Sequence, residues 1–221
     1  MGIERNIQEV QTRIARACER GGRSPNEITL VAITKTHDAA TVRAAFEAGL
    51  RHFGENRIQE ADPKLAELED MRSQSTWHMV GHLQTNKVKT AVELFDIIQS
   101  VDSVKLANFL SRNVQKPLPI FLEVNIAEEA SKSGFSIAEI FGAVSEIGRM
   151  PNLQIRGLMT IAPWVADPEE VRPVFRQLRE LRDSLGLDQL SMGMTDDFEL
   201  AIEEGATAVR VGRAIFGQRR A

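Results

Sequence analysis

The sequence contains no tyrosine and only one cysteine among its 221 residues. A single cysteine, Cys18, excludes a disulfide within the chain. It lies in a helix-like segment, and we interpret it as a small, buried apolar side chain. No apolar run approaches the roughly 20 residues that a membrane-spanning helix requires. The glycine-rich patterns GxGxxG and GxxxxGK[ST], which open many nucleotide-binding sheets, are also absent.

The charge balance is mildly acidic, because 31 acidic and 27 basic side chains give a net charge of −4. This balance argues against nucleic acid or an anionic membrane as the main partner. The initial Met-Gly is followed neither by a signal-peptide core nor by the serine or threonine of a myristoylation site. We therefore expect a soluble, cytoplasmic protein.

Short β-branched runs alternate with amphipathic helical stretches along the whole chain, a pattern typical of parallel α/β folds. The runs that we interpret as strands are 28–35, 51–55, 75–81, 94–100, 119–126, 153–161, 189–193 and 208–212. Eight strands with helices between them predict one closed (β/α)8 barrel of the TIM type over residues 1–221. An open doubly wound sheet is less favoured, since it would usually begin with a glycine-rich turn.

Helix signals support this interpretation independently. The segment 42–50 keeps apolar residues at helical spacing and stops at Gly49, and 171–186 closes in the same way at Gly186. Asp167 followed by Pro168 marks a helix start. A further helix at the N-terminus, about residues 3–21, is expected to cover the bottom or the side of the barrel.

Lys35 ends the run ITLVAITK and is the sharpest candidate for chemistry. Barrels of this kind place their active sites at the C-terminal ends of the strands. A lysine there can simply extend into water. However, the preceding residues 30–33 fit a strand buried on both faces, and an amine held beside it loses hydration. That loss favours the neutral amine, which condenses with an aldehyde or ketone to a Schiff base.

The segment SMGMTDDFELAIEEGATAVRVG carries a second cluster around Thr195. Thr195 either caps the helix that follows or, with adjacent amides, binds an anion at the start of that helix. In the second case Asp196 and Asp197 should point outwards. Gly212, just after the eighth strand, would let backbone amides approach the same anion. TIM-type barrels often hold phosphate at the loops after strands seven and eight.

Arg210 lies inside the last predicted strand, where a guanidinium is costly unless it is paired or faces a ligand. It either forms a core salt bridge, for example with Glu123, or donates to a ring nitrogen or phosphate. An amine, an anion site and an arginine between them describe a pocket for a phosphorylated aldehyde. Pyridoxal phosphate (PLP) is the obvious candidate.

Six stretches, in order from residue 31 to 217, together resemble the YggS/PROSC family, also called the pyridoxal phosphate homeostasis proteins. They are VAITKT, FGENRIQE, WHMVGHLQTNK, GLMTIAP, LSMGMTDDFELAI and VRVGRAIFG. The resemblance implies an alanine-racemase-like barrel of PLP fold type III. It also implies PLP bound as an internal aldimine on Lys35, and Arg210 facing the pyridine nitrogen. Phosphate contacts are implied at Thr195, Gly212 and nearby backbone, which includes Met194.

Other positions match the family pattern with less definite roles. Asn56 corresponds to a rim residue that contacts the cofactor, whereas His82 and Lys87 match without an assigned role. A metal site is not predicted, because no third ligand accompanies the two histidines of WHMVGH. Lys132 offers a second amine, and we hypothesise that it receives or passes on the aldehyde. Arg213 replaces a hydroxyl common in relatives, and it either adds a phosphate contact or points away.

The missing tyrosine matters for the reaction. Racemases that share this barrel type use the cofactor lysine and a tyrosine from an additional C-terminal domain. A chain that ends at Ala221 is expected to lack that domain, and no tyrosine is present to replace it. A two-base alanine racemase is therefore excluded, and a monomer is expected because the racemase dimer interface would be absent.

The favoured function is a protein that holds PLP reversibly, limits the free aldehyde and supplies apo PLP enzymes, without strong catalysis of its own. A PLP enzyme acting on an amino acid stays open, for example with His82 as a base. So does an aldolase in which Lys35 attacks its substrate directly.

Overall fold

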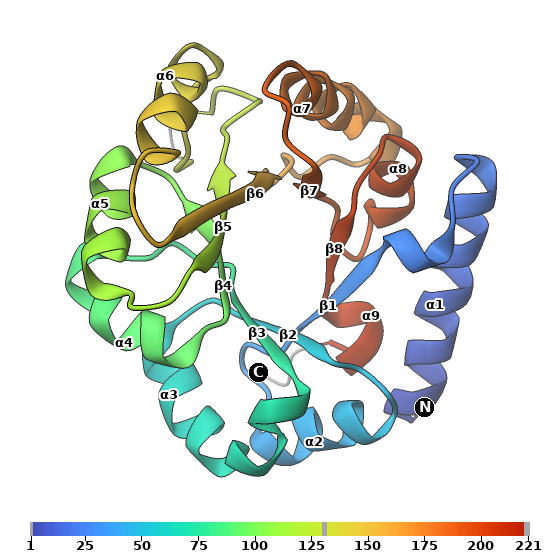
Figure 1. Ribbon diagram of the computed structural model, residues 1–221. Coiled ribbons are helices and arrows are strands. Elements are labelled where there is room, and N and C mark those ends of the chain that lie inside the picture. The colour runs from blue at the N-terminus through green and yellow to red at the C-terminus, as the bar shows by residue number, and fades with distance from the viewer. Residues whose placement is uncertain (1, 130–131, 219–221) are drawn as a thin grey trace.

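The computed structural model describes residues 2–129 and 132–218, and its centre is a closed barrel of eight parallel strands (Figure 1). The barrel closes because β1 pairs with β8 as well as with β2. The strands are β1 (Thr29–Ile33), β2 (His52–Glu55), β3 (Thr76–Met79), β4 (Ile97–Val101), β5 (Leu118–Glu123), β6 (Leu153–Met159), β7 (Gln189–Ser191) and β8 (Ala208–Val211). The prediction of a (β/α)8 barrel is confirmed.

The observed strands are mostly shorter at their C-terminal ends than the sequence runs predicted. The last residues of a run leave the ladder and bend to form the rim of the barrel, as at β1, which ends at Ile33. The predicted strand 94–100 also begins too early, because Leu94 is the last residue of α4 (Val88–Leu94). Apolar content alone could not separate the end of that helix from the start of β4.

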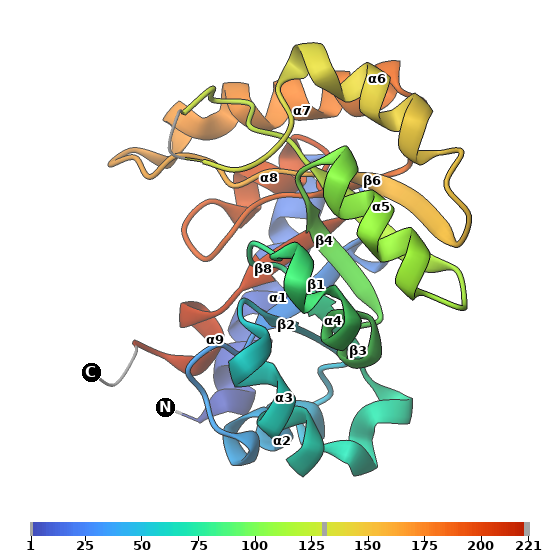
Figure 2. The same cartoon turned by 90° about the vertical axis from the view of Figure 1, so that its left-hand side faces the viewer.

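Helices surround the barrel and cover the outer faces of its strands (Figures 1 and 2). Besides α4 they are α1 (Ile3–Arg20), α2 (Ala39–Glu47), α3 (Ile58–Glu67), α5 (Val104–Asn113), α6 (Ile137–Ile147), α7 (Arg172–Ser184), α8 (Phe198–Glu203) and α9 (Arg213–Phe216). Short 3-10 segments are η1 (Pro25–Glu27), η2 (Glu69–Gln74), η3 (Thr85–Lys87) and η4 (Pro168–Val171). In the described part of the chain no helix combines the length and apolarity needed to cross a membrane.

Local signals explain where two predicted helices begin. The Asp38 carboxylate accepts the Thr41 N–H at 2.8 Å and starts α2 three residues before the predicted 42–50. Asp167 does act as a helix-start residue, since its carboxylate accepts the Glu169 N–H at 3.0 Å. The segment that it caps is the 3-10 turn η4, and α7 begins only at Arg172.

The predicted N-terminal helix lies at the side of the barrel, where α1 packs against α8 and α9 (Figure 1). Its buried face includes Ile7 and Cys18, as expected for an amphipathic helix on an apolar surface. Two ion pairs join it to α8, between Arg13 and Glu199 and between Arg20 and Glu203. The first strand and the first helix are therefore both held by elements from the last part of the sequence.

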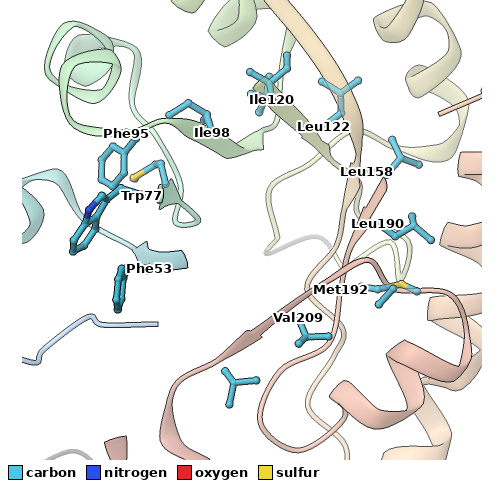
Figure 3. Close-up of a cluster of buried hydrophobic side chains, with 14 of the residues drawn as sticks. Phe53, Trp77, Phe95, Ile98, Ile120, Leu122, Leu158, Leu190, Met192 and Val209 are labelled. Carbon is cyan, nitrogen blue, oxygen red and sulfur yellow. The ribbon is translucent and has the colours of Figure 1, made fainter. Parts of the chain in front are cut away.

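The main hydrophobic core lies between the strands and the surrounding helices. Apolar side chains that face outwards from the barrel fill this layer, among them Phe53, Trp77, Ile98, Leu158 and Val209 (Figure 3). All five are fully buried. Because strand side chains alternate between the two faces, the residues next to them point into the barrel, where polar groups gather.

Candidate functional site

A cavity of about 560 Å³ opens at the C-terminal ends of β1, β7 and β8. Five of the six predicted cofactor-binding residues line it: Lys35, Met194, Thr195, Arg210 and Gly212. The remaining lining residues are Ile33, His37, Asp196, Arg213, Gly217 and Gln218. The barrel thus brings an amine, a guanidinium and a hydroxyl to one concave site.

Lys35 is half-buried two residues beyond the end of β1 and lines the cavity together with Ile33. The two side chains share a face because directions alternate along an extended segment. The next residue, Thr36, has φ of 67°, a left-handed conformation that β-branched residues rarely adopt. Such a conformation persists where neighbouring contacts enforce it, and such residues gather at functional sites.

Helix α3 supplies these contacts on both sides of the lysine. The Thr36 N–H donates to the Glu60 carboxylate, and the Lys64 ammonium donates to the Thr34 carbonyl at 2.8 Å. Lys64 also donates to Glu55 at 2.6 Å, and the Thr34 hydroxyl donates to the same Glu55 oxygen at 2.7 Å. The end of β1 is therefore tied to one helix by the residues before and after the lysine.

The Glu55–Lys64 ion pair is buried, with side-chain exposures of 0% and 6%. Burial raises the pKa of the Glu55 carboxyl, and the Lys64 ammonium opposes that shift. The second Glu55 oxygen, Oε2, has no hydrogen-bond partner among the described residues. Each charge in this pair therefore depends on the other, because an unpaired charge at such a depth is costly.

Arg210 is 5% exposed and donates three hydrogen bonds inside the barrel. Nη1 donates to the Ser191 carbonyl at 2.8 Å and to its hydroxyl at 2.7 Å, and Nη2 donates to the Thr160 carbonyl at 2.7 Å. The alternative of a direct salt bridge with Glu123 is wrong, since in the described part of the chain Arg210 donates to Ser191 and Thr160 instead, and the Glu123 charge acts on it only from a distance. Burial lowers the pKa of Arg210 to about 10, so the side chain is still a cation at neutral pH.

The loop after β7 differs from expectation. Helix α8 begins at Phe198 with Asp197 as its N-cap, so Thr195 does not cap it. The anion-binding alternative required both acidic side chains to point outwards. This is wrong for Asp197, whereas the Asp196 side chain is exposed. The Asp197 carboxylate turns back, accepts the Met194 N–H at 2.5 Å and has a pKa raised by burial. Asp196 lines the cavity and pairs with Arg213, whose guanidinium is thereby held across the loop.

Asn56 does not line the cavity of Lys35. It directly follows β2, the strand that pairs with β1 in the register Ile33 to Gly54. Its backbone is packed so closely that a Cβ at Gly81 would lie 2.3 Å from the Asn56 carbonyl oxygen. Asn56 instead borders two adjacent cavities, of about 430 and 210 Å³.

The smaller adjacent cavity contains Lys132, whose ammonium donates to Glu129 at 2.5 Å and to the Ile161 carbonyl at 3.2 Å. His82 borders both adjacent cavities and pairs with Asp102 at 2.8 Å. Among the residues that the structure describes, no group of three or more His, Cys, Asp or Glu side chains is arranged to hold a metal ion.

Sequence reasoning missed His37, which lines the cavity, and the α3 residues Glu60 and Lys64. The i,i+4 spacing of Glu60 and Lys64 was visible in the sequence, but it usually marks an exposed helix pair. Nothing in the sequence showed that this helix face turns towards the end of β1.

Comparison with known proteins places the chain in a family. The sequence-family model of the alanine racemase N-terminal domain matches residues 3–220. The pyridoxal phosphate homeostasis protein of Pseudomonas aeruginosa is 45% identical, over 98% of this chain and 96% of its own. That of Aquifex aeolicus is 42% identical, over 97% of both chains. This chain belongs to the pyridoxal phosphate homeostasis protein family.

Comparison with solved structures supports the same family assignment. PipY of Synechococcus elongatus, a structure with PLP bound, is 37% identical with a TM-score of 0.86, over 97% of this chain and all of its own. Alanine racemase of Corynebacterium glutamicum shares the fold at 18% identity and a TM-score of 0.71. That comparison covers 98% of this chain but only 61% of the racemase. The homeostasis protein family thus shares the barrel of the racemase over part of the racemase's length.

Proposed function

We propose that this chain binds PLP reversibly through Lys35 and acts in PLP homeostasis by holding the cofactor and delivering it. The observation that carries the proposal is the shared cavity of Lys35, Thr195, Arg210 and Gly212 in a chain of the PLP homeostasis family. The cofactor supplies an aldehyde to which an amine can bond covalently. The amine of Lys35 is the one that the cavity presents.

The residues around the cavity fit such a ligand. Its volume of about 560 Å³ lies within the range usual for small-molecule sites, roughly 300–1,000 Å³. The Thr195 hydroxyl and the backbone at Gly212 would hold the phosphate at the loops after β7 and β8. Arg210 would face the pyridine ring, and Met194 would contribute its backbone beside Thr195 on the phosphate side. Arg213 is at the phosphate side, where its pairing with Asp196 would have to compete with a phosphate contact.

Arg210 also favours binding over catalysis. A guanidinium only donates hydrogen bonds, so it stabilises a pyridine nitrogen that carries no proton. PLP enzymes that need a strong electron sink place an acid there instead. With no tyrosine in the chain, the second base of a racemase is missing as well. We therefore favour a carrier over an enzyme that acts on an amino acid.

The wider setting is part of the proposal. We propose that residues 1–221 work as a single barrel domain, that the protein is a cytoplasmic monomer, and that apo PLP enzymes are the recipients. Asn56, which directly follows the neighbouring strand β2, would contact the cofactor from that side.

The test begins with the absorption spectrum of the purified protein after addition of PLP. We expect a visible band that disappears on borohydride reduction, with the label on Lys35 by peptide mapping. Lys35→Ala should lose the band, and Lys105→Ala on the exposed face of α5 should retain it. An unlabelled Lys35 would refute the proposal. Rapid racemisation or deuterium exchange of any added amino acid would favour the enzyme instead.

A further inference from the structure

A continuous chain of hydrogen bonds crosses the interior of the barrel and ends on Arg210. From Arg210 of β8 it runs to Ser191 of β7 at 2.7 Å and then to Gln99 of β4 at 2.6 Å. It continues to His78 of β3 at 2.9 Å and to His52 of β2 at 3.1 Å. Since β4 and β7 are not neighbours in the sheet, the step between them spans the barrel.

The donors in this chain can point in only one direction. Arg210 cannot accept, so the Ser191 oxygen accepts from it, and the Ser191 hydroxyl donates to Gln99 Oε1. The Gln99 amide must then present Nε2–H to His78 Nδ1. His78 therefore carries its proton on Nε2 and donates to His52 Nδ1. One charged end fixes the amide orientation and the tautomer of both imidazoles.

The middle of this hydrogen-bond chain is buried, which prevents water from replacing its protein partners. Ser191 and Gln99 are fully buried and His78 is 3% exposed, so no member of the middle of the chain can exchange its partner for water. Burial lowers the pKa of His78 to about 3, and burial likewise lowers the pKa of His52. Both imidazoles are thus neutral at pH 7, as the one-way donation requires.

We propose that Ser191, Gln99 and His78 are positioning residues that hold the Arg210 guanidinium in one orientation towards the cofactor cavity. Both Nη1 hydrogens and one Nη2 hydrogen of Arg210 are used inside the barrel. Within residues 2–129 and 132–218, the Nε–H and the second Nη2 hydrogen donate to no protein group, so they are available to a ligand ring. The inference rests on the proposed function for the identity of that ligand, but the hydrogen-bond chain itself does not depend on it.

The first test needs no cofactor. Nitrogen-15 NMR of the four histidines should show His78 as the neutral Nε2–H tautomer throughout pH 5–8. Ser191→Ala releases the Gln99 amide, so His78 should become a mixture of tautomers. Gln99→Glu accepts from both neighbours, so it should move the His78 proton to Nδ1. An unchanged His78 tautomer in both variants would overturn the proposal.

The second test measures PLP. Ser191→Ala should weaken PLP binding about tenfold, the loss expected for one hydrogen bond to a charged group, and should shift the absorption of bound PLP. Gln99→Glu, which keeps an acceptor for Ser191, should bind more tightly than Ser191→Ala.

Ser111→Ala is the matched control, because Ser111 is also buried and donates one bond of 2.7 Å, to the Pro151 carbonyl, on the outer layer. If Ser191→Ala and Ser111→Ala have the same PLP affinity and the same absorption spectrum of bound PLP, the positioning role is refuted. Absence of PLP binding in the unmodified protein would refute the proposed function instead, and the NMR result would still decide the hydrogen-bond chain.

Discussion

The buried ion pair behind Lys35 offers a stability prediction with a defined size. Lys64→Met removes the ammonium that lies 2.6 Å from Glu55 and leaves that carboxylate fully buried. Breaking one side of a buried pair costs about 3–5 kcal/mol, because the remaining charge is neither solvated nor compensated. We expect that loss in the free energy of unfolding at pH 7. Urea denaturation followed by the fluorescence of buried Trp77 would measure it.

The pH dependence follows from the direction of the shift. The pKa of Glu55 is already raised by burial, and loss of Lys64 removes the interaction that lowers it. A carboxyl with a raised pKa in the folded state stabilises that state when protonated, and this stability is lost as pH rises through the folded pKa. The deficit of Lys64→Met should therefore be largest at pH 7–8 and shrink towards about pH 4.3, the ordinary value for glutamate.

A double variant separates charge from packing. Glu55→Leu with Lys64→Met replaces the pair by apolar side chains, and we expect stability within about 2 kcal/mol of the unmodified protein. The residual loss reflects the Thr34 carbonyl, which loses the Lys64 ammonium, and the Thr34 hydroxyl, which loses Glu55 and retains only the Gly54 carbonyl at 3.3 Å. Lys105→Met on the exposed face of α5 should change stability by less than about 0.5 kcal/mol. A double variant as unstable as Lys64→Met alone would contradict the electrostatic explanation.

Four further variants test other parts of the molecule. A Cβ at Gly157 would lie 1.8 Å from the Gln189 carbonyl oxygen, so Gly157→Ala should cost about 3 kcal/mol or more in urea denaturation. Gly142→Ala in α6, where nothing lies within 4 Å, should instead stabilise by about 0.5–1 kcal/mol. Burial raises the pKa of Glu204, but hydrogen bonds from the α7 arginines lower it further, so the net shift is downwards. The stability that ionised Glu204 contributes should therefore be lost as pH falls below about 4. Glu204→Gln should make the free energy of unfolding depend less on pH in this acid range. Lys132→Ala should load PLP normally but transfer it to an apo-enzyme more slowly, and equal transfer rates would remove the second-amine hypothesis.

The fold and most of the candidate site could be predicted because their signals are local. Eight strand-like runs that alternate with helical segments define the barrel, and strand ends define its mouth, so the sequence alone placed Lys35 and Gly212 near each other. The residues at those strand ends also carried the resemblance to the family. Boundaries were less predictable, as at Leu94, where helix and strand share the same apolar character.

Features that depend on non-local contacts could not be predicted. Arg210 was considered as a partner of Glu123, but its real partners are Ser191 and Thr160, which lie on other strands or just beyond their ends. The Asp197 carboxylate turned inwards because the Met194 N–H offered a partner, whereas Asp196 stayed exposed and paired with Arg213. These side-chain partners are determined by the tertiary structure of the barrel, so residue spacing along the sequence cannot predict them.

Closure of the barrel has a consequence for the order of folding. The first strand, β1, completes its ladder only against β8, and the first helix, α1, packs mainly against α8 and α9. During synthesis the apolar face of α1 and one edge of β1 therefore stay exposed until α8, β8 and α9 have been made. Contacts between such distant segments form slowly. Until they form, residues 1–33 of the newly made chain expose apolar surface through which the chain can aggregate.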